Sequence, residues 1–193
     1  MAADSTKILA GVSAGTGNAL VSVGPVGTTA PTTAIASLNV AFKNLGWVST
    51  DGVTKSVDVN TEEIGAFGAS GAVRVLKTSA TTTLQCTLLE SNPNVIEVYN
   101  ELALNSITVS GTDGSFDFVE GPLRTQRYAL VIDMIDGANH IRGVAPLVEV
   151  TDKDDFQIAG GSAVQYNVTF TAYPGSDGTA IHWYYVVAAL ITP

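Results

Sequence analysis

The chain has 193 residues, 14% of them charged and 46% hydrophobic, and its 18 acidic against nine basic side chains give a formal net charge of −9. This length suits one compact domain with a sizeable core, and a second full domain is not expected. An acidic chain with scattered cations lacks the basic face of a nucleic-acid-binding protein, and a charged fraction below the ~25% of average soluble proteins indicates a surface that contacts other subunits as well as water.

The first 44 residues predict an extended arm that includes the first strand or strands. Gly, Thr, Ser and Pro separate two short strand-like pieces, at residues 8–12 and 19–23. The segment 8–42 carries no charge, but these residues break it too often for a membrane helix. We therefore expect no membrane association, and we expect residues 45–193 to form a single β-barrel domain.

Three short patterns lie between residues 45 and 92. The first reads LGWVSTDGV (45–53), the second NTEEIGAFG (60–68) and the third LLESN (88–92). The Asp-Gly pair in the first pattern marks a turn, and two strand-like runs separate the second pattern from the third. The segment thus begins at a strand end, continues through polar residues and returns as strands.

One helix is predicted, from about residue 93 to residue 103. Asn92 can cap it through its side-chain oxygen, and Pro93 suits the first helical position because its missing N–H has no partner there in any case. Apolar residues then share one face: Val95, Val98, Tyr99 and Leu102. The exposed face is expected to carry Glu97 and Glu101, which are like charges four residues apart and add no helical support.

Four later runs rich in Val, Ile, Thr and aromatic residues predict strands, at residues 127–135, 140–150, 163–173 and 182–191. Asp136-Gly137 indicates a hairpin turn between the first two, because both residues tolerate positive φ. In the third run, apolar residues alternate with polar ones and should point into the core: Val164, Tyr166, Val168 and Phe170. The fold class is therefore mainly β, an antiparallel β-barrel or sandwich of two packed sheets with one α-helix covering a side. Such a barrel has open edges unless a neighbour closes them.

One motif could indicate a nucleophile. Residues 11–15 match the G-x-S-x-G pattern around a reactive serine, Ser13, but too few residues precede it to supply the oxyanion-hole strand. Only His140 or His182 could act as its base, and each lies in a strand-like run. We expect no enzyme activity, with a serine hydrolase at Ser13 as the enzyme alternative.

Candidate metal ligands are equally sparse. Asp152, Asp154 and Asp155 could offer oxygen ligands to calcium, but they lack the glycine and the distal glutamate of an EF-hand loop. Two histidines and one cysteine without ligand spacing argue against a zinc site. Cys86 cannot form an intramolecular disulfide, and its place in a strand-like run predicts a buried, inert thiol. No metal and no cofactor are expected.

The patterns at 45–53, 60–68 and 88–92 resemble, in the same order, those of the major tail tube protein of long-tailed (siphovirus-type) bacteriophages. The resemblance implies a fold like that of phage tail tubes and of the type VI secretion tube. It also implies a structural virion protein that self-assembles into stacked hexameric rings, which form the conduit for DNA delivery into the host. The segment 49–70 would be a loop that reaches the adjacent ring, with four contact residues: Glu62, Glu63, Ile64 and Phe67.

The same resemblance implies the partners and the location. Other tail proteins (tape measure, terminator and tip) would contact the tube, and genomic DNA would pass through the lumen without specific binding. The protein would assemble in the host cytoplasm and reside in the virion tail. Acidic side chains on the inner wall would make it non-adhesive to DNA, since a basic wall would bind phosphates and release counterions. The candidate lumen acids are Asp58, Asp117 and Glu149.

Several alternatives share these sequence features. An all-β virion decoration protein or adhesin would have the same composition but would stay monomeric or trimeric. A tube of a type VI or other contractile system would share the ring architecture. The segment 49–70 could fold onto its own subunit, and a monomer rich in uncharged Thr, Ser and Gly would also carry little charge.

Overall fold

The computed structural model describes residues 5–10, 20–122, 124–156 and 158–190. Almost all of its regular structure is antiparallel β, with one short α-helix, as the sequence predicts. The elements are η1 (Ser5–Lys7), β1 (Val21–Pro25), β2 (Lys43–Asn44), β3 (Val48–Gly65), β4 (Ala72–Leu88), α1 (Pro93–Tyr99), β5 (Arg127–Asp136), β6 (Asn139–Lys153), β7 (Tyr166–Ala172), β8 (His182–Val186) and η2 (Ala188–Leu190).

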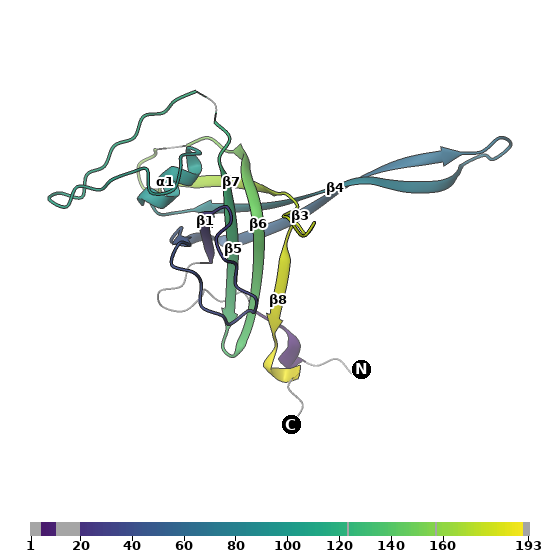
Figure 1. Ribbon diagram of the computed structural model, residues 1–193, viewed down its shortest axis with the longest axis horizontal. Helices are drawn as coiled ribbons and strands as arrows, with labels where there is room; N and C mark the ends of the chain where they lie inside the picture. Colours follow the sequence, from purple (N-terminus) through teal and green to yellow (C-terminus); the bar gives the residue numbers. More distant parts are fainter. Residues whose placement is uncertain (1–4, 11–19, 123, 157, 191–193) are drawn as a thin grey trace.

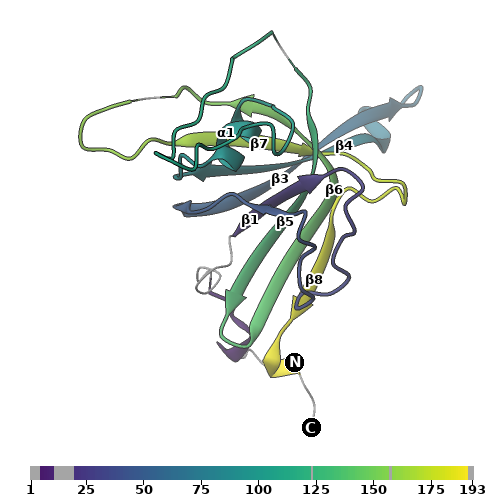
Figure 2. The same ribbon diagram turned by 60° about the vertical axis from the view of Figure 1, so that its left-hand side comes forward.

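The strands belong to one open sheet, and not to two separate sheets. Their order is β2-β1-β5-β6-β7-β4-β3, and β8 pairs with β6 outside this path. The long strand β6 connects two layers, because residues 140–144 pair with β8 whereas residues 148–153 pair with β7. A register shift opposite Tyr128 and Leu130 separates the two stretches, and irregularities of this kind bend a strand. Figures 1 and 2 show β3, β4 and β7 crossing steeply over β5, β6 and β8.

The main core lies between these two layers and under α1. The alternation predicted for β7 is confirmed, since Tyr166, Val168 and Phe170 are all buried there. Where the layers meet at the β8 side, the ammonium group of Lys55 lies 5.7 Å from the ring centre of Trp183. The sheet therefore wraps the main core without closing into a barrel, and a smaller cluster that includes Phe42 and Val131 lies on the other face of β5.

The helix begins as predicted and ends four residues early. The side-chain oxygen of Asn92 accepts the N–H of Val95 at 3.0 Å, with Pro93 in the first turn. After Tyr99 the chain leaves the helix through Glu101, whose φ is +53°. The N–H of Leu102 then donates to the carbonyl of Glu97 at 2.7 Å, which together with the bond from Glu101 to Val98 forms a Schellman cap. Leu102 is still buried, so its apolar character reflects this cap and not a further helical turn.

The ends of the chain differ in part from the predicted strands. The strand predicted at 19–23 starts at Val21, and as β1 it pairs with β5 inside the sheet, with Val21 and Val23 buried. Residues 8–10 are not in a strand, and residues 11 and 12 lie outside the described residues. The last predicted strand ends at Val186, and the chain continues as η2.

Candidate assembly surfaces

Residues 57–81 form a two-stranded arm that projects far from the body of the molecule (Figure 1). The arm begins where β4 loses its pairing with β7, after the pair Thr82 and Ala172. Valines at alternate positions continue both strands, at 57 and 59 in β3 and at 73 and 75 in β4. The predicted loop at 49–70 is therefore wrong in its conformation: β3 runs to Gly65, and only the apex, residues 66–71, is irregular. Every arm residue except Leu76 is exposed. Isolated two-stranded hairpins are only marginally stable in water, and this one has almost no contact with the body of its own chain.

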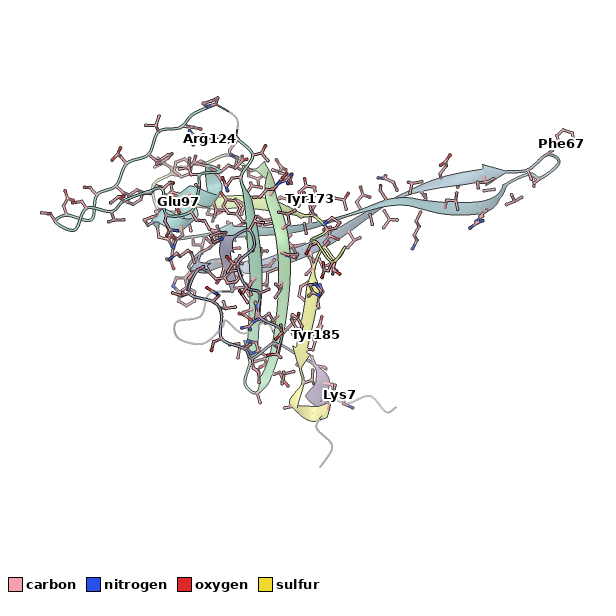
Figure 3. The ribbon with its side chains drawn as sticks, viewed as in Figure 1. Lys7, Phe67, Glu97, Arg124, Tyr173 and Tyr185 are labelled. Carbon is pink, nitrogen blue, oxygen red and sulfur yellow. The ribbon has the colours of Figure 1, made fainter. Side chains whose placement is uncertain are left out.

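The four predicted contact residues all lie on this arm but do not form one patch. The pairing register places Glu62 and Ile64 on one face and Glu63 on the other. Phe67 lies at the apex, fully exposed, at the far end of the molecule (Figure 3). Exposed valines add to the apolar surface of the arm: Val57, Val59, Val73 and Val75.

A second projecting element lies between α1 and β5, and the sequence reasoning missed it. Figure 1 shows it extending from the body on the side opposite the arm. We call residues 108–121 the acidic loop, because they contain Asp113, Asp117 and Glu120 and no Lys or Arg. A signal was present in the sequence, since a connection of this length without strand periodicity is uncommon in a compact domain unless it is functional.

Glu97 holds the base of this loop in place. The sequence predicted an exposed Glu97, but the residue is only 1% exposed, and its carboxylate accepts the N–H groups of Asn105 at 2.9 Å and Ile107 at 2.8 Å. The prediction was wrong because helical position alone does not reveal a loop that folds back over the polar face. Leu104, Ile107 and Phe116 pack against the main core as well.

Hydrogen bonds also order the tip of the acidic loop. Ser110 donates its N–H to the carbonyl of Ser115 at 2.7 Å, and the Asp113 carboxylate accepts the N–H and the hydroxyl of Ser115 at 3.1 and 2.7 Å. These bonds, led by the Ser115 hydroxyl, lower the pKa of Asp113 to about 2. Asp113 therefore remains negatively charged at all ordinary pH values.

The sheet face opposite the core is polar on β3, β4, β7 and β6. The register aligns Ser56 with Thr83, Thr83 with Thr171, and Thr171 with Glu149. Asp58 follows Ser56 by two residues and so shares this face. Two of the three candidate lumen acids, Asp58 and Glu149, are therefore on one face, whereas Asp117 lies apart on the acidic loop.

Arg127 and Glu149 form an ion pair on this polar face. The Nε atom of Arg127 lies 2.5 Å from Oε1 of Glu149, whose side chain is mostly buried. Besides the acids Asp58 and Asp152, the face carries hydroxyl and amide side chains: Thr54, Ser56, Thr81, Thr83, Gln85, Thr87, Thr151, Asn167, Thr169 and Thr171. A phosphate group near this face would thus meet no unpaired cation among these residues.

A buried ion pair secures the segment before β2 over the other side of β5 and β6. Arg142 binds Asp133 through two nitrogens, at 2.6 and 2.9 Å, and donates to the carbonyls of Thr33 and Ala36. Arg142, Asp133 and Ala36 line a cavity of about 390 Å³, together with His140. Arg142 already binds the Asp133 carboxylate, so this ion pair has a structural role: it holds the segment before β2 against the sheet.

The other chemical candidates are not assembled into a site by the described residues. His182 contacts Asp177 at 2.7 Å, and Ser13 lies outside the described residues. Within the described part of the chain, no group of three or more His, Cys, Asp or Glu side chains could hold a metal ion. No helix in that part is long and apolar enough to cross a membrane.

Cys86 lies inside the main core on β4, so its predicted burial is confirmed. Burial raises the pKa of its thiol to about 12. The nucleophilic thiolate is therefore nearly absent at neutral pH, and the side chain acts as a small apolar residue.

The chain matches a model of the family described as phage tail tube protein over residues 1–189. No curated protein matches it. One similar solved structure is a chain from the virion of a native gene transfer agent particle, with 7% sequence identity and a TM-score of 0.40, and the match covers 77% of this chain and 92% of that chain. The family match includes both the arm and the acidic loop.

Proposed function

The chain belongs to the phage tail tube protein family, a family of structural virion proteins, and we propose that its copies form hexameric rings that stack into the tail tube and conduct DNA into the host. The tube would assemble in the host cytoplasm and contact the other tail proteins, including the tape measure, the terminator and the tip. Family membership supports the tail tube role itself, and the features of this chain support the manner of assembly.

The observation that carries this proposal is the open sheet. β3 ends the sheet on one side, and among the described residues no strand covers its outer edge. An 18-residue edge strand with exposed backbone groups invites pairing with another chain. Edge pairing between different surfaces of identical subunits makes a closed ring when the rotation between them closes. The β3 edge, which would promote aggregation of a monomer, would thus form the contact between neighbouring subunits of the ring.

Stacking of the rings would depend on the arm. At about 3.3 Å per strand residue, the stretch 57–65 spans about 30 Å, enough to reach beyond the subunit that carries it. The next ring would be contacted by the four predicted residues, Glu62, Glu63, Ile64 and Phe67. Phe67 would reach farthest into that ring because it lies at the apex of the arm. Burial of these exposed side chains would supply the stability that an isolated hairpin lacks.

The polar face is the candidate wall of the lumen. Asp58 and Glu149 share it, and its one cation near Glu149 is already paired. Hydroxyl and amide groups can exchange hydrogen bonds with water, and they release no counterions from DNA. DNA would thus slide past without being held.

Electron microscopy of the purified protein over a concentration series tests the proposal. We expect hollow rods of uniform width whose end views have sixfold symmetry, appearing above a threshold concentration. Dispersed monomers at every concentration would contradict the proposal, and compact trimers would favour a decoration protein instead.

A further inference from the structure

We propose that the acidic loop of one copy receives the arm of another copy. This inference rests on the proposed function and names the partner surface of the arm. The two elements extend in opposite directions along the longest axis of the molecule (Figure 1). A contact between two different surfaces at opposite ends repeats from subunit to subunit, and it gives an open stack when the rotation between copies does not close a ring.

The distribution of charged residues indicates that the β4 strand of the arm makes this contact. The arm portion of β4, residues 72–81, contains Arg74 and Lys77 and no acid, whereas the acidic loop contains three acids and no base. The register places Arg74 and Lys77 on opposite faces, because they pair with Ile64 and Thr61. This strand therefore presents a cation on either side.

The β3 half of the arm would be repelled by the same surface. It contains Asp58, Glu62 and Glu63, which would face the like charges of the acidic loop. Screening over about 8 Å at physiological salt confines these forces to residues in contact, so they set the orientation of docking and do not act at long range. Only docking with β4 toward the loop brings opposite charges together, so Glu62 and Glu63 would contact the next ring outside its acidic loop.

Exposed apolar side chains accompany the charges on both elements. Val73 and Val75 are 58% and 54% exposed, and they share the face of Lys77, whereas Arg74 lies on the other face. On the loop, Phe118 and Val119 lie between the acids Asp117 and Glu120, and Val119 is 78% exposed. Each surface thus has an apolar centre with charges beside it, which is the usual composition of a specific protein interface.

The acidic loop is already ordered before any partner arrives. Glu97 accepts two backbone N–H groups at its base, Phe116 packs on the core, and Asp113 orders the tip. Binding to an ordered surface costs less conformational entropy than binding to a mobile one. Beyond Thr82, the outer edge of β4 has no partner strand among the described residues, so it is open to this contact.

Cross-linking between two variants tests the contact directly. Protein with Val75→Cys is mixed with protein with Val119→Cys, and oxidised dimer is measured before and after rods form. The matched control replaces the second variant by Val40→Cys, which is 90% exposed but lies outside the acidic loop. We expect at least about tenfold more dimer from the first mixture, only in the assembled state. Rods that give equal yields in both mixtures would overturn the inference and leave the proposed function standing.

Charge exchange provides a second, independent test. Arg74→Glu with Lys77→Glu should raise the threshold concentration for rods at least about tenfold, and so should Asp117→Lys with Glu120→Lys. The chain with all four changes again has opposite charges at the exchanged positions of the arm and the loop, and it should assemble again near the original threshold. Failure of this combined variant, with the unaltered chain forming rods, would overturn the arm and loop contact alone. Failure of the unaltered chain to form rods would overturn the proposed function and this inference with it.

Discussion

Glu90 lies directly against Gly46, with its carboxylate in the space that a Cβ at position 46 would occupy. Its Oε1 accepts the N–H of Trp47 at 2.9 Å, and its Oε2 accepts the side-chain amide of Asn92 at 3.0 Å. One carboxylate therefore joins the chain before β3 to the cap of α1. The first and third sequence patterns, separated by more than thirty residues in the chain, contact each other through this pair.

The Gly46→Ala substitution should destabilise the fold by about 2–5 kcal/mol, because the added methyl overlaps Glu90 and the φ of +79° is unfavourable for alanine. Gly52→Ala is the matched control, since its φ is +69° but no atom lies within 4 Å of the new Cβ. That control should cost only about 1–2 kcal/mol. Urea unfolding of the unassembled proteins measures the free energy of unfolding of both variants. Equal decreases would show that the overlap with Glu90 does not contribute to the loss of stability.

Glu97→Ala should loosen the acidic loop. Two backbone N–H groups lose their acceptor, which costs about 1–3 kcal/mol where they stay buried. Limited proteolysis should then cleave within residues 104–122 much faster, while the body stays intact. Glu120→Ala removes an exposed carboxylate from the same loop and should leave the cleavage rate unchanged, so similar rates for both variants would contradict this role of Glu97.

Removal of the arm should separate ring formation from stacking. Residues 58–81 can be replaced by Asn-Gly, which forms a tight turn and joins Val57 to its pairing partner Thr82. Because nearly all the deleted residues are exposed, the body should unfold at nearly the same temperature. Electron microscopy should show single rings and no rods. Rods of normal length from this variant would show that the arm is not needed for stacking.

A lysine on the polar face should slow DNA delivery. Gln85 is exposed in the middle of this face, so Gln85→Lys would add one phosphate-binding charge per subunit along the proposed lumen. DNA release from virions should become slower at low salt and recover at high salt. Thr32→Lys adds the same charge on an exposed residue outside the face and serves as the control; an identical effect of both changes would argue against a lumen at Gln85.

Cys86 should not react with thiol reagents in the native protein. A pKa raised to about 12 keeps the thiol protonated at pH 8, and core packing blocks access to it. Reaction with a chromogenic disulfide should start only when denaturant unfolds the chain, and its rate should follow the unfolded fraction. Fast labelling without denaturant would reveal an opening of β4 that the packed core does not predict.

Local patterns in the sequence were sufficient for several elements. Alternation in 163–173 predicted which side chains of β7 are buried, because a strand places successive residues on opposite faces whatever it packs against. Asn92 and Pro93 predicted the start of α1, because capping depends on atoms within the first turn. A hairpin turn follows β5 as predicted, but Asp136 pairs with Asn139, so the two loop residues are Gly137, with a φ of +59°, and Ala138.

Other features depended on residues far apart in the chain. Neither the burial of Glu97 nor the common face of Asp58 and Glu149 can be deduced from neighbouring residues, since the first requires a loop that returns ten residues later and the second requires the register of four strands. The polar segment after residue 49 became a strand because its partner β4 supplied the backbone hydrogen bonds. The sequence by itself thus determined the mainly antiparallel β character, the start of the helix and the family. The tertiary structure decided which edges stay open and which surfaces project, because those depend on long-range pairing that no local periodicity encodes.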